Sequence, residues 1–159
     1  MRWLLACLIA CPAFAEDAPF ASFDKASEPV LNDPHDLAFG PDGRLYVADK
    51  FGARIAVFDP ETLELVDELA IGMLPGVHDI AFGPSGEAVI AVTGAGAVAI
   101  WNDPATIGSD PDVVLSAPGT EGAVMHPNGK VYASGAGALL VYDGPSSLVL
   151  PTAIPARMT

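Results

Sequence analysis

The apolar positions of this chain fall into short alternating runs, most of them closed by glycine or proline. Runs of four to eight residues with a period of two are typical of β-strands, because successive side chains of a strand point to opposite faces. Pro41-Asp42-Gly43 shows how the runs are joined, since proline presets φ and glycine accepts positive φ in a tight turn. We predict strands at residues 35–40, 44–48, 54–58, 63–70, 78–83, 87–93, 97–101, 112–116, 122–125, 130–134, 138–142 and 147–150.

These strands recur in three copies of one unit, seen in residues 34–49, 77–92 and 121–134. The turn residues keep a constant spacing of 43: Pro41, Pro84 and Pro127, and likewise Gly43, Gly86 and Gly129. A unit of about 40–45 residues with four strands has the size of one β-propeller blade. We therefore predict an all-β fold of about three four-stranded antiparallel blades, a partial or half propeller.

The repeat also predicts the domain organisation. Blade 1 is expected at residues 34–76, blade 2 at 77–119, and blade 3 with the C-terminal end at 120–159. Residues 16–33 would form an N-terminal extension that could supply one extra strand. Residues 34–59 and 77–102 resemble NHL-type propeller repeats, and the third copy is a weaker match. This resemblance, which covers residues 34 to about 154, implies the fold far more than any function, because propellers host many unrelated activities.

Three blades are fewer than the four to eight that typically close a propeller. An open arc of blades would expose an apolar sheet face at each end, and such faces are sites of association or aggregation. The sequence leaves three interpretations. The chain is a piece of a longer gene product, or a homodimer closes a six-bladed ring about a two-fold axis, or the monomer is open.

The first fifteen residues have the pattern of a secretory signal peptide. Arg2 precedes an apolar run at residues 3–11, and Ala13-Phe14-Ala15 presents small residues at the two positions that a signal peptidase reads. We predict export, either periplasmic or extracellular. Alternatively, Leu8-Ile9-Ala10-Cys11 resembles a bacterial lipobox, which would make the protein a lipoprotein anchored through Cys11. No later segment has the roughly 20 unbroken apolar residues of a membrane span.

Composition narrows the class of protein further. The chain has 20 acidic and 7 basic residues and a net charge of −13, so it lacks the cationic surface that nucleic-acid phosphates require. Its 51% hydrophobic content is too high for a disordered chain. Both cysteines, Cys7 and Cys11, lie in the predicted signal peptide, so we expect the exported protein to have neither disulfides nor thiol chemistry.

The candidate chemistry lies at the start of the innermost strands. His35, His78 and Glu121 are each one repeat apart, so we expect them to form an arc around one mouth of the propeller channel. Two imidazoles and a carboxylate suit a divalent metal such as zinc or calcium, the one kind of cofactor that the residues suggest. The structural alternative is that these polar side chains simply hydrogen-bond the neighbouring blade.

Four charged residues complete the candidate mouth. Asp36 and Asp79 directly follow the two histidines, and they too could bond the neighbouring blade. Asp49 and Arg54 flank the turn between the second and third strands of blade 1. We predict that this pair meets across its hairpin, and it would otherwise be available to a bound molecule.

The resemblance to propellers adds one implication for these residues. NHL-like peptidyl-hydroxyglycine amidating lyases hold zinc by histidines at this Pro-His position, and only His35 and His78 carry over, since Glu121 departs from that pattern. The cation-binding motifs of gluconolactonase-like propellers do not match. Two functions follow. The first is a binding or interaction module with a protein or small-molecule ligand at the channel mouth. The alternative is a metal-dependent enzyme, lyase or lactonase-like, that uses His35, His78 and Glu121.

Overall fold

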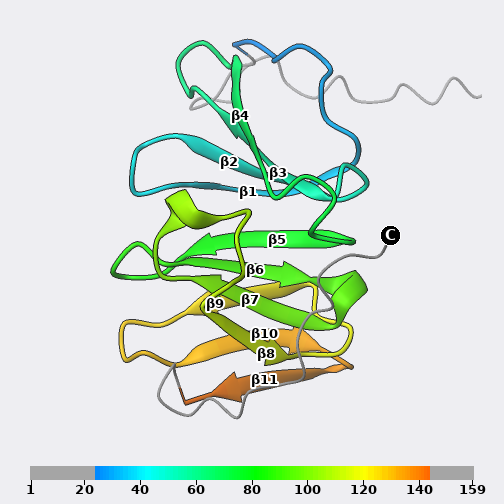
Figure 1. The fold of residues 1–159 in the computed structure, drawn as a ribbon, viewed down its shortest axis with the longest axis vertical. Helices are drawn as coiled ribbons and strands as arrows, with labels where there is room; N and C mark the ends of the chain where they lie inside the picture. The colour runs from blue at the N-terminus through cyan, green and yellow to red at the C-terminus, as the bar shows by residue number, and fades with distance from the viewer. Residues whose placement is uncertain (1–23, 144–159) are drawn as a thin grey trace, which may run out of the picture.

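The computed structural model describes residues 24–143, which form three antiparallel β-sheets stacked face to face along the long axis of the molecule (Figure 1). Blade 1 contains β1 (Pro34–Phe39), β2 (Leu45–Asp49), β3 (Arg54–Phe58) and β4 (Leu65–Leu69). Blade 2 contains β5 (Val77–Phe82), β6 (Ala88–Val92), β7 (Ala97–Trp101) and β8 (Val113–Ser116). Blade 3 contains β9 (Gly122–Met125), β10 (Val131–Gly135) and β11 (Ala138–Tyr142). Each sheet pairs its strands in chain order.

This architecture confirms the predicted all-β fold of antiparallel propeller blades. Each strand begins and ends within two residues of its predicted bounds, and β3, β7, β9 and β11 coincide with them. Besides strands, the described residues contain only two short 3₁₀ turns, at Thr93–Ala95 and Pro104–Thr106. The fourth strand predicted for blade 3, at residues 147–150, lies outside the described residues. So do the predicted signal peptide and Cys11 of the alternative lipobox.

The tight turns explain the repeated glycines. In the first turn of each blade, Gly43, Gly86 and Gly129 adopt φ values of 81°, 99° and 83°. This left-handed conformation is costly for residues with a Cβ atom, and glycine reaches it freely. A proline two residues earlier supplies the fixed φ that opens the same turn. The local sequence therefore sets the points at which each chain reversal occurs.

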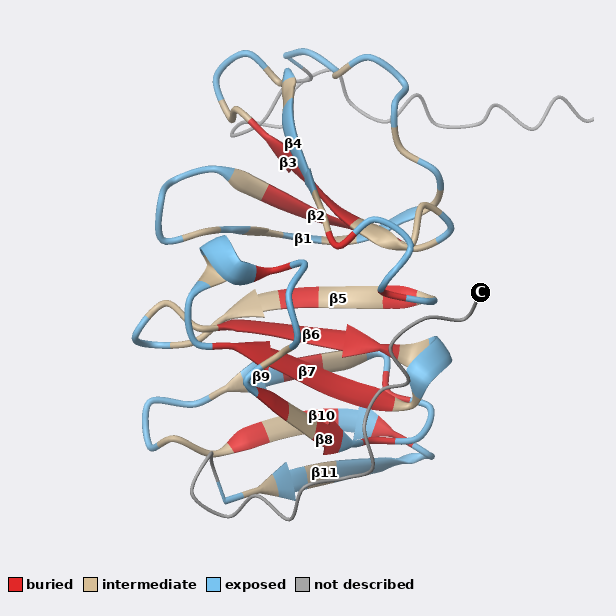
Figure 2. Cartoon of the chain, in the orientation of Figure 1, coloured by how far each residue is buried: buried red, intermediate tan, exposed pale blue. Residues whose placement is uncertain are grey.

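The core lies between the blades, and the middle blade is buried on both faces. One cluster joins blades 1 and 2 and includes Val57, Ile80 and Trp101. A second cluster joins blades 2 and 3 and includes Val98 and Val131. Every residue of β6 and β7 is buried (Figure 2). This is why these two strands read as unbroken apolar runs, because a strand covered on both faces has no solvent side to alternate with.

The N-terminal extension lies against the outer side of blade 1. The main-chain N–H of Asn32 donates to Asp49 Oδ1 at 2.7 Å, and Arg54 Nη2 donates to the carbonyl oxygen of Val30 at 2.6 Å. Leu31 packs on a small third cluster that includes Phe58. The extra strand predicted for this extension is not formed within residues 24–33. No helix among residues 24–143 is long and apolar enough to cross a membrane.

Candidate functional site

Two β-bulges place the predicted histidines. In blade 1 the register between β1 and β2 shifts between Pro34 and Asp36, so that His35 is an extra residue without a partner. The same shift occurs between Val77 and Asp79 in blade 2, around His78. A bulge bends its strand and re-aims the side chain at that point. The repeat therefore reproduces a local distortion as well as a residue type.

The bulges bring the two imidazoles into contact across the junction between blades 1 and 2. The ring centroids of His35 and His78 are 4.1 Å apart, with the rings inclined at 61°. The edge of the stack where β1 and β5 begin is called here the histidine edge, comprising Asp33, His35, Lys50, His78 and Glu121. His35 has a side-chain exposure of 25%, so the edge is open to solvent.

Hydrogen bonds orient both rings. His35 Nε2 lies 3.1 Å from Asp33 Oδ2, and the Lys50 ammonium lies 3.4 Å from the same nitrogen. When Nε2–H donates to Asp33, the lone pair of the neutral His35 ring is on Nδ1. His78 Nδ1 lies 3.1 Å from the carbonyl oxygen of Glu121, so donation there leaves the lone pair on Nε2. Each ring can therefore offer one nitrogen as a proton or ligand acceptor.

The structure brings together two of the three predicted metal ligands through their side chains. Glu121 joins the edge by its main-chain carbonyl, while the residue as a whole is exposed. Across residues 24–143, no group of three or more His, Cys, Asp or Glu side chains is arranged to hold a metal ion. A structural zinc site uses four protein ligands and a catalytic site usually three. The predicted metal site therefore stays a prediction.

Asp36 and Asp79 have partners in the next blade. Asp36 Oδ2 accepts a hydrogen bond from the N–H of Ile80 at 3.2 Å, and Asp79 Oδ2 accepts one from the N–H of Ala123 at 2.5 Å. The same bond thus recurs at both junctions. The pKa of Asp79 is raised from 3.8 to about 7, chiefly by burial; the hydrogen bond and negative charge of Asp36 add to this rise, and the Ala123 N–H opposes it. These carboxyl groups hold consecutive blades together.

Asp49 and Arg54 meet across their hairpin, as predicted. Arg54 Nε donates to Asp49 Oδ2 at 2.8 Å, and the Asp49 side chain is fully buried. Arg54 also pairs with Glu68 on β4. Since the other oxygen of Asp49 accepts the N–H of Asn32, this carboxylate is fully engaged inside the fold. The pair anchors the N-terminal extension to blade 1.

Two features of the surface lie beyond the residues singled out from the sequence. One is Asp33, which has a φ of 69° and whose carboxylate reaches His35. The one sequence feature that could have pointed to Asp33 is its position directly before Pro34.

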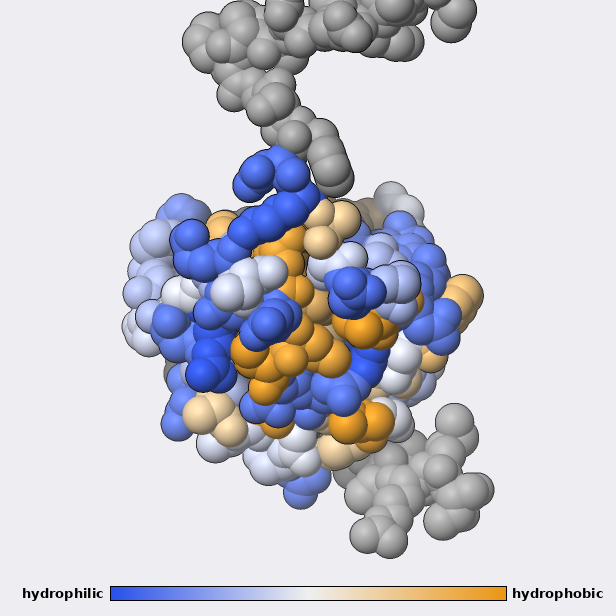
Figure 3. All heavy atoms as spheres, turned by 90° about the horizontal axis from the view of Figure 1, so that it is seen from above, coloured by the Kyte–Doolittle hydropathy of each residue, from blue (hydrophilic) through white to orange (hydrophobic). Residues whose placement is uncertain are grey.

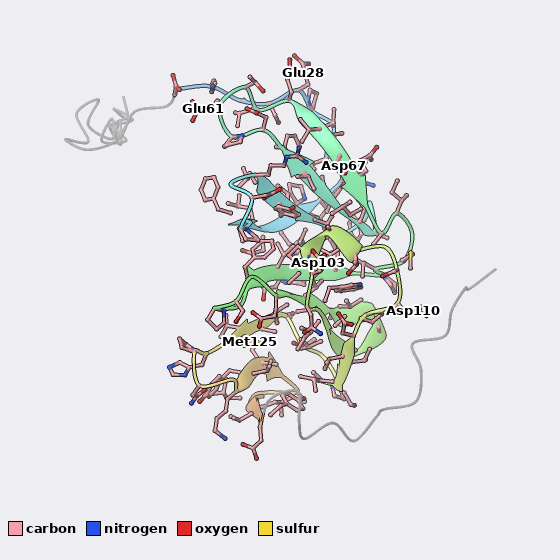
Figure 4. The ribbon with its side chains drawn as sticks, turned by 60° about the vertical axis from the view of Figure 1, so that its left-hand side comes forward. Glu28, Glu61, Asp67, Asp103, Asp110 and Met125 are labelled. Carbon is pink, nitrogen blue, oxygen red and sulfur yellow. The ribbon has the colours of Figure 1, made fainter. Side chains whose placement is uncertain are left out.

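The other is a groove of about 270 Å³ between blades 1 and 2, at the ends of the strands opposite the histidine edge. Asp67 from β4 and Asp103 from the β7–β8 connection are among its lining residues (Figure 4). Pro41 and Asp42 of the first turn of blade 1 and Tyr46 of β2 also line it, so the groove combines repeated positions of blade 1 with a connection of blade 2.

The comparisons with known proteins agree with this geometry. The NHL repeat family matches residues 31–58. Among solved structures, the chain is similar to the hydrazine synthase of Kuenenia stuttgartiensis, with a TM-score of 0.56, 21% identity, and coverage of 70% of this chain and 34% of that chain. It is also similar to a luciferin-regenerating enzyme, with a TM-score of 0.52, 19% identity, and coverage of 70% and 40%.

A streptogramin B lyase gives a TM-score of 0.52 at 14% identity, with coverage of 75% of this chain and 43% of that chain. The chain thus spans less than half the length of each of these structures. At these identities the likeness shows a shared fold and carries no activity with it. The comparison with curated proteins gives no match.

Proposed function

We propose that this chain, an NHL-repeat β-propeller protein, is a binding module whose ligand contacts the histidine edge. The observation that carries the proposal is the contact between His35 and His78, which two consecutive repeats bring to a solvent-accessible edge. The edge offers imidazole nitrogens, the Asp33 carboxylate and the Lys50 ammonium within a few ångströms of one another. Such a mixture of donors and acceptors suits a small polar molecule or an extended peptide main chain.

Export of the protein is part of the same proposal. It rests on the signal-like pattern of residues 1–15. The test is the N-terminal sequence of the protein recovered outside the cytoplasm. Soluble export predicts a chain that begins at Glu16. A lipid-modified chain that begins at Cys11 would instead support the lipoprotein alternative, and a retained Met1 would contradict export.

The binding role is tested by thermal unfolding in the presence of a panel of dipeptides, sugar lactones and dicarboxylates. We expect at least one class to raise the melting temperature, because a ligand that binds only the folded state stabilises it. The effect should vanish when His35 and His78 are both replaced by alanine. His126→Ala is the matched control, since this third histidine directly follows β9, at the end of the strand opposite the histidine edge, and lies beside Tyr132. Equal loss in the control would contradict the proposal.

A metal-dependent enzyme, lyase or lactonase-like, is the second candidate. It is favoured by the two oriented rings, because a carboxylate or carbonyl behind an imidazole is the usual arrangement around metal-ligating histidines. His35, His78 and the Glu121 side chain would then be ligands, with water completing the set. Calorimetric titration with zinc chloride tests this candidate. Unchanged zinc affinity in the His35→Ala, His78→Ala double variant would eliminate it.

A further inference from the structure

The two ends of the stack of blades expose apolar side chains at positions that the internal junctions bury. On β1, Leu37 and Phe39 are 59% and 65% exposed. One repeat later, Ile80 is 1% exposed and Phe82 packs into the cluster shared with blade 1. The outward side of blade 1 is called here the leading face. Figure 3, viewed onto this end of the molecule, shows a continuous apolar patch at its centre.

The opposite end exposes the complementary side of a blade, called here the trailing face of blade 3. Leu139 and Val141 on β11 are 68% and 51% exposed. Strand pairing identifies their equivalents in blade 2, because Leu139 is the second residue of β11 as Val98 is of β7. Val98 and Ile100 are 0% and 2% exposed, since blade 3 covers them. This end face is therefore built like the covered trailing face of blade 2.

We propose that a second copy of this chain covers both faces. The trailing face of blade 3 in each copy packs on the leading face of blade 1 in the other, so that the three blades described in residues 24–143 of each chain together form a six-bladed ring. Both internal junctions join one trailing face to one leading face, so the new junction continues an arrangement that the molecule already makes twice. A second copy presents both faces at once. Two-fold closure uses each of these two faces once in each copy, which avoids open filaments.

The details of the end faces indicate a contact weaker than the internal junctions. The carboxylate that bonds the next blade is Asp36 in blade 1 and Asp79 in blade 2, whereas the equivalent position in blade 3 is Gly122. Apolar contact alone would therefore hold the new junction. On β2 and β3 the leading face is already covered in the single chain, since Leu31 packs on a cluster of buried Val47, Ala56 and Phe58, so the contact is confined to the exposed part of the face on β1. We expect a dimer that dissociates on dilution.

The test measures the mass of the purified protein by light scattering and sedimentation equilibrium over a wide range of concentration. We expect twice the mass of one chain at high concentration. Phe39→Lys on the leading face and Leu139→Glu on the trailing face should each raise the dissociation constant by about a hundredfold or more, because a charge would be buried without a designed partner. Both side chains are exposed in the single chain, so these variants should keep its fold, which circular dichroism checks.

Mixing the two variants gives the decisive result. In a mixed dimer, one junction pairs two unaltered faces, so mixing should restore dimers that neither variant forms alone. Ile71→Glu is the matched control, since Ile71 is 63% exposed but lies in the connection between blades 1 and 2. A monomer at all concentrations would overturn the proposal. So would a dimer that resists Leu139→Glu, which would join two leading faces, or an association that grows beyond two chains.

Discussion

Replacing Asp79 by asparagine tests the carboxyl group that joins blade 2 to blade 3. In the native protein Asp79 Oδ2 accepts the N–H of Ala123, and the Asp36 carboxyl is its neighbour on the other side. An asparagine keeps the acceptor for Ala123 and supplies an N–H toward Asp36, as protonated Asp79 does. The substitution therefore preserves the hydrogen bonds of the protonated form and removes the titration.

The sign of the effect follows from the direction of the pKa shift. The Asp79 pKa rises from 3.8 to about 7 on folding, so between these values the folded state holds a proton that the unfolded state has released. Stability is then fully present below the unfolded pKa and is lost as the pH rises through the folded pKa. The shift corresponds to about 4 kcal/mol if unscreened. Since the residue is only partly buried, solvent screening reduces this to about 2 kcal/mol.

The assay is urea unfolding at about pH 4.5 and about pH 8, followed by circular dichroism. The free energy of unfolding of the native protein should fall by about 2 kcal/mol more than that of Asp79→Asn over this interval. Asp110→Asn is the control, because it removes one carboxylate from an exposed connection and should follow the native pH dependence (Figure 4). Parallel pH dependence in Asp79→Asn and the native protein would show that the titration of Asp79 does not control the stability of the fold.

Two further substitutions test contacts that hold the blades in shape. Arg54→Met should lower the free energy of unfolding by about 3 kcal/mol, because it leaves the buried Asp49 carboxylate without its cation. Arg44→Met, which breaks an exposed pair, should cost under about 1 kcal/mol, and equal costs in urea unfolding would contradict the assignment. Gly94→Ala should cost about 2 kcal/mol, because its Cβ would lie 2.4 Å from the Pro75 carbonyl oxygen, and an unchanged melting temperature would contradict this.

The strands, the turns and the blade repeat could be predicted from the amino-acid sequence alone. The bounds of β3 at Arg54–Phe58 could be predicted because the alternation of side chains and the flanking turn residues are local properties of the chain. The pairing of Asp49 with Arg54 was predictable for the same reason, since a hairpin brings the two ends of its turn together. The repeat also selected His35 and His78, because equal positions in successive blades lie at the same edge.

The contacts that these residues make depend on how the blades pack in three dimensions. The contact between His35 and His78 depends on two bulges and on the packing of one blade against the next, and these cross a separation of 43 residues. The bonds that Asp36 and Asp79 make to the following blade depend on the same packing. Asp33 reaches His35 only through a left-handed backbone conformation that no periodic pattern encodes. The local sequence determines where each strand begins and ends. The contacts between blades depend on how the side chains of two whole sheet faces pack together.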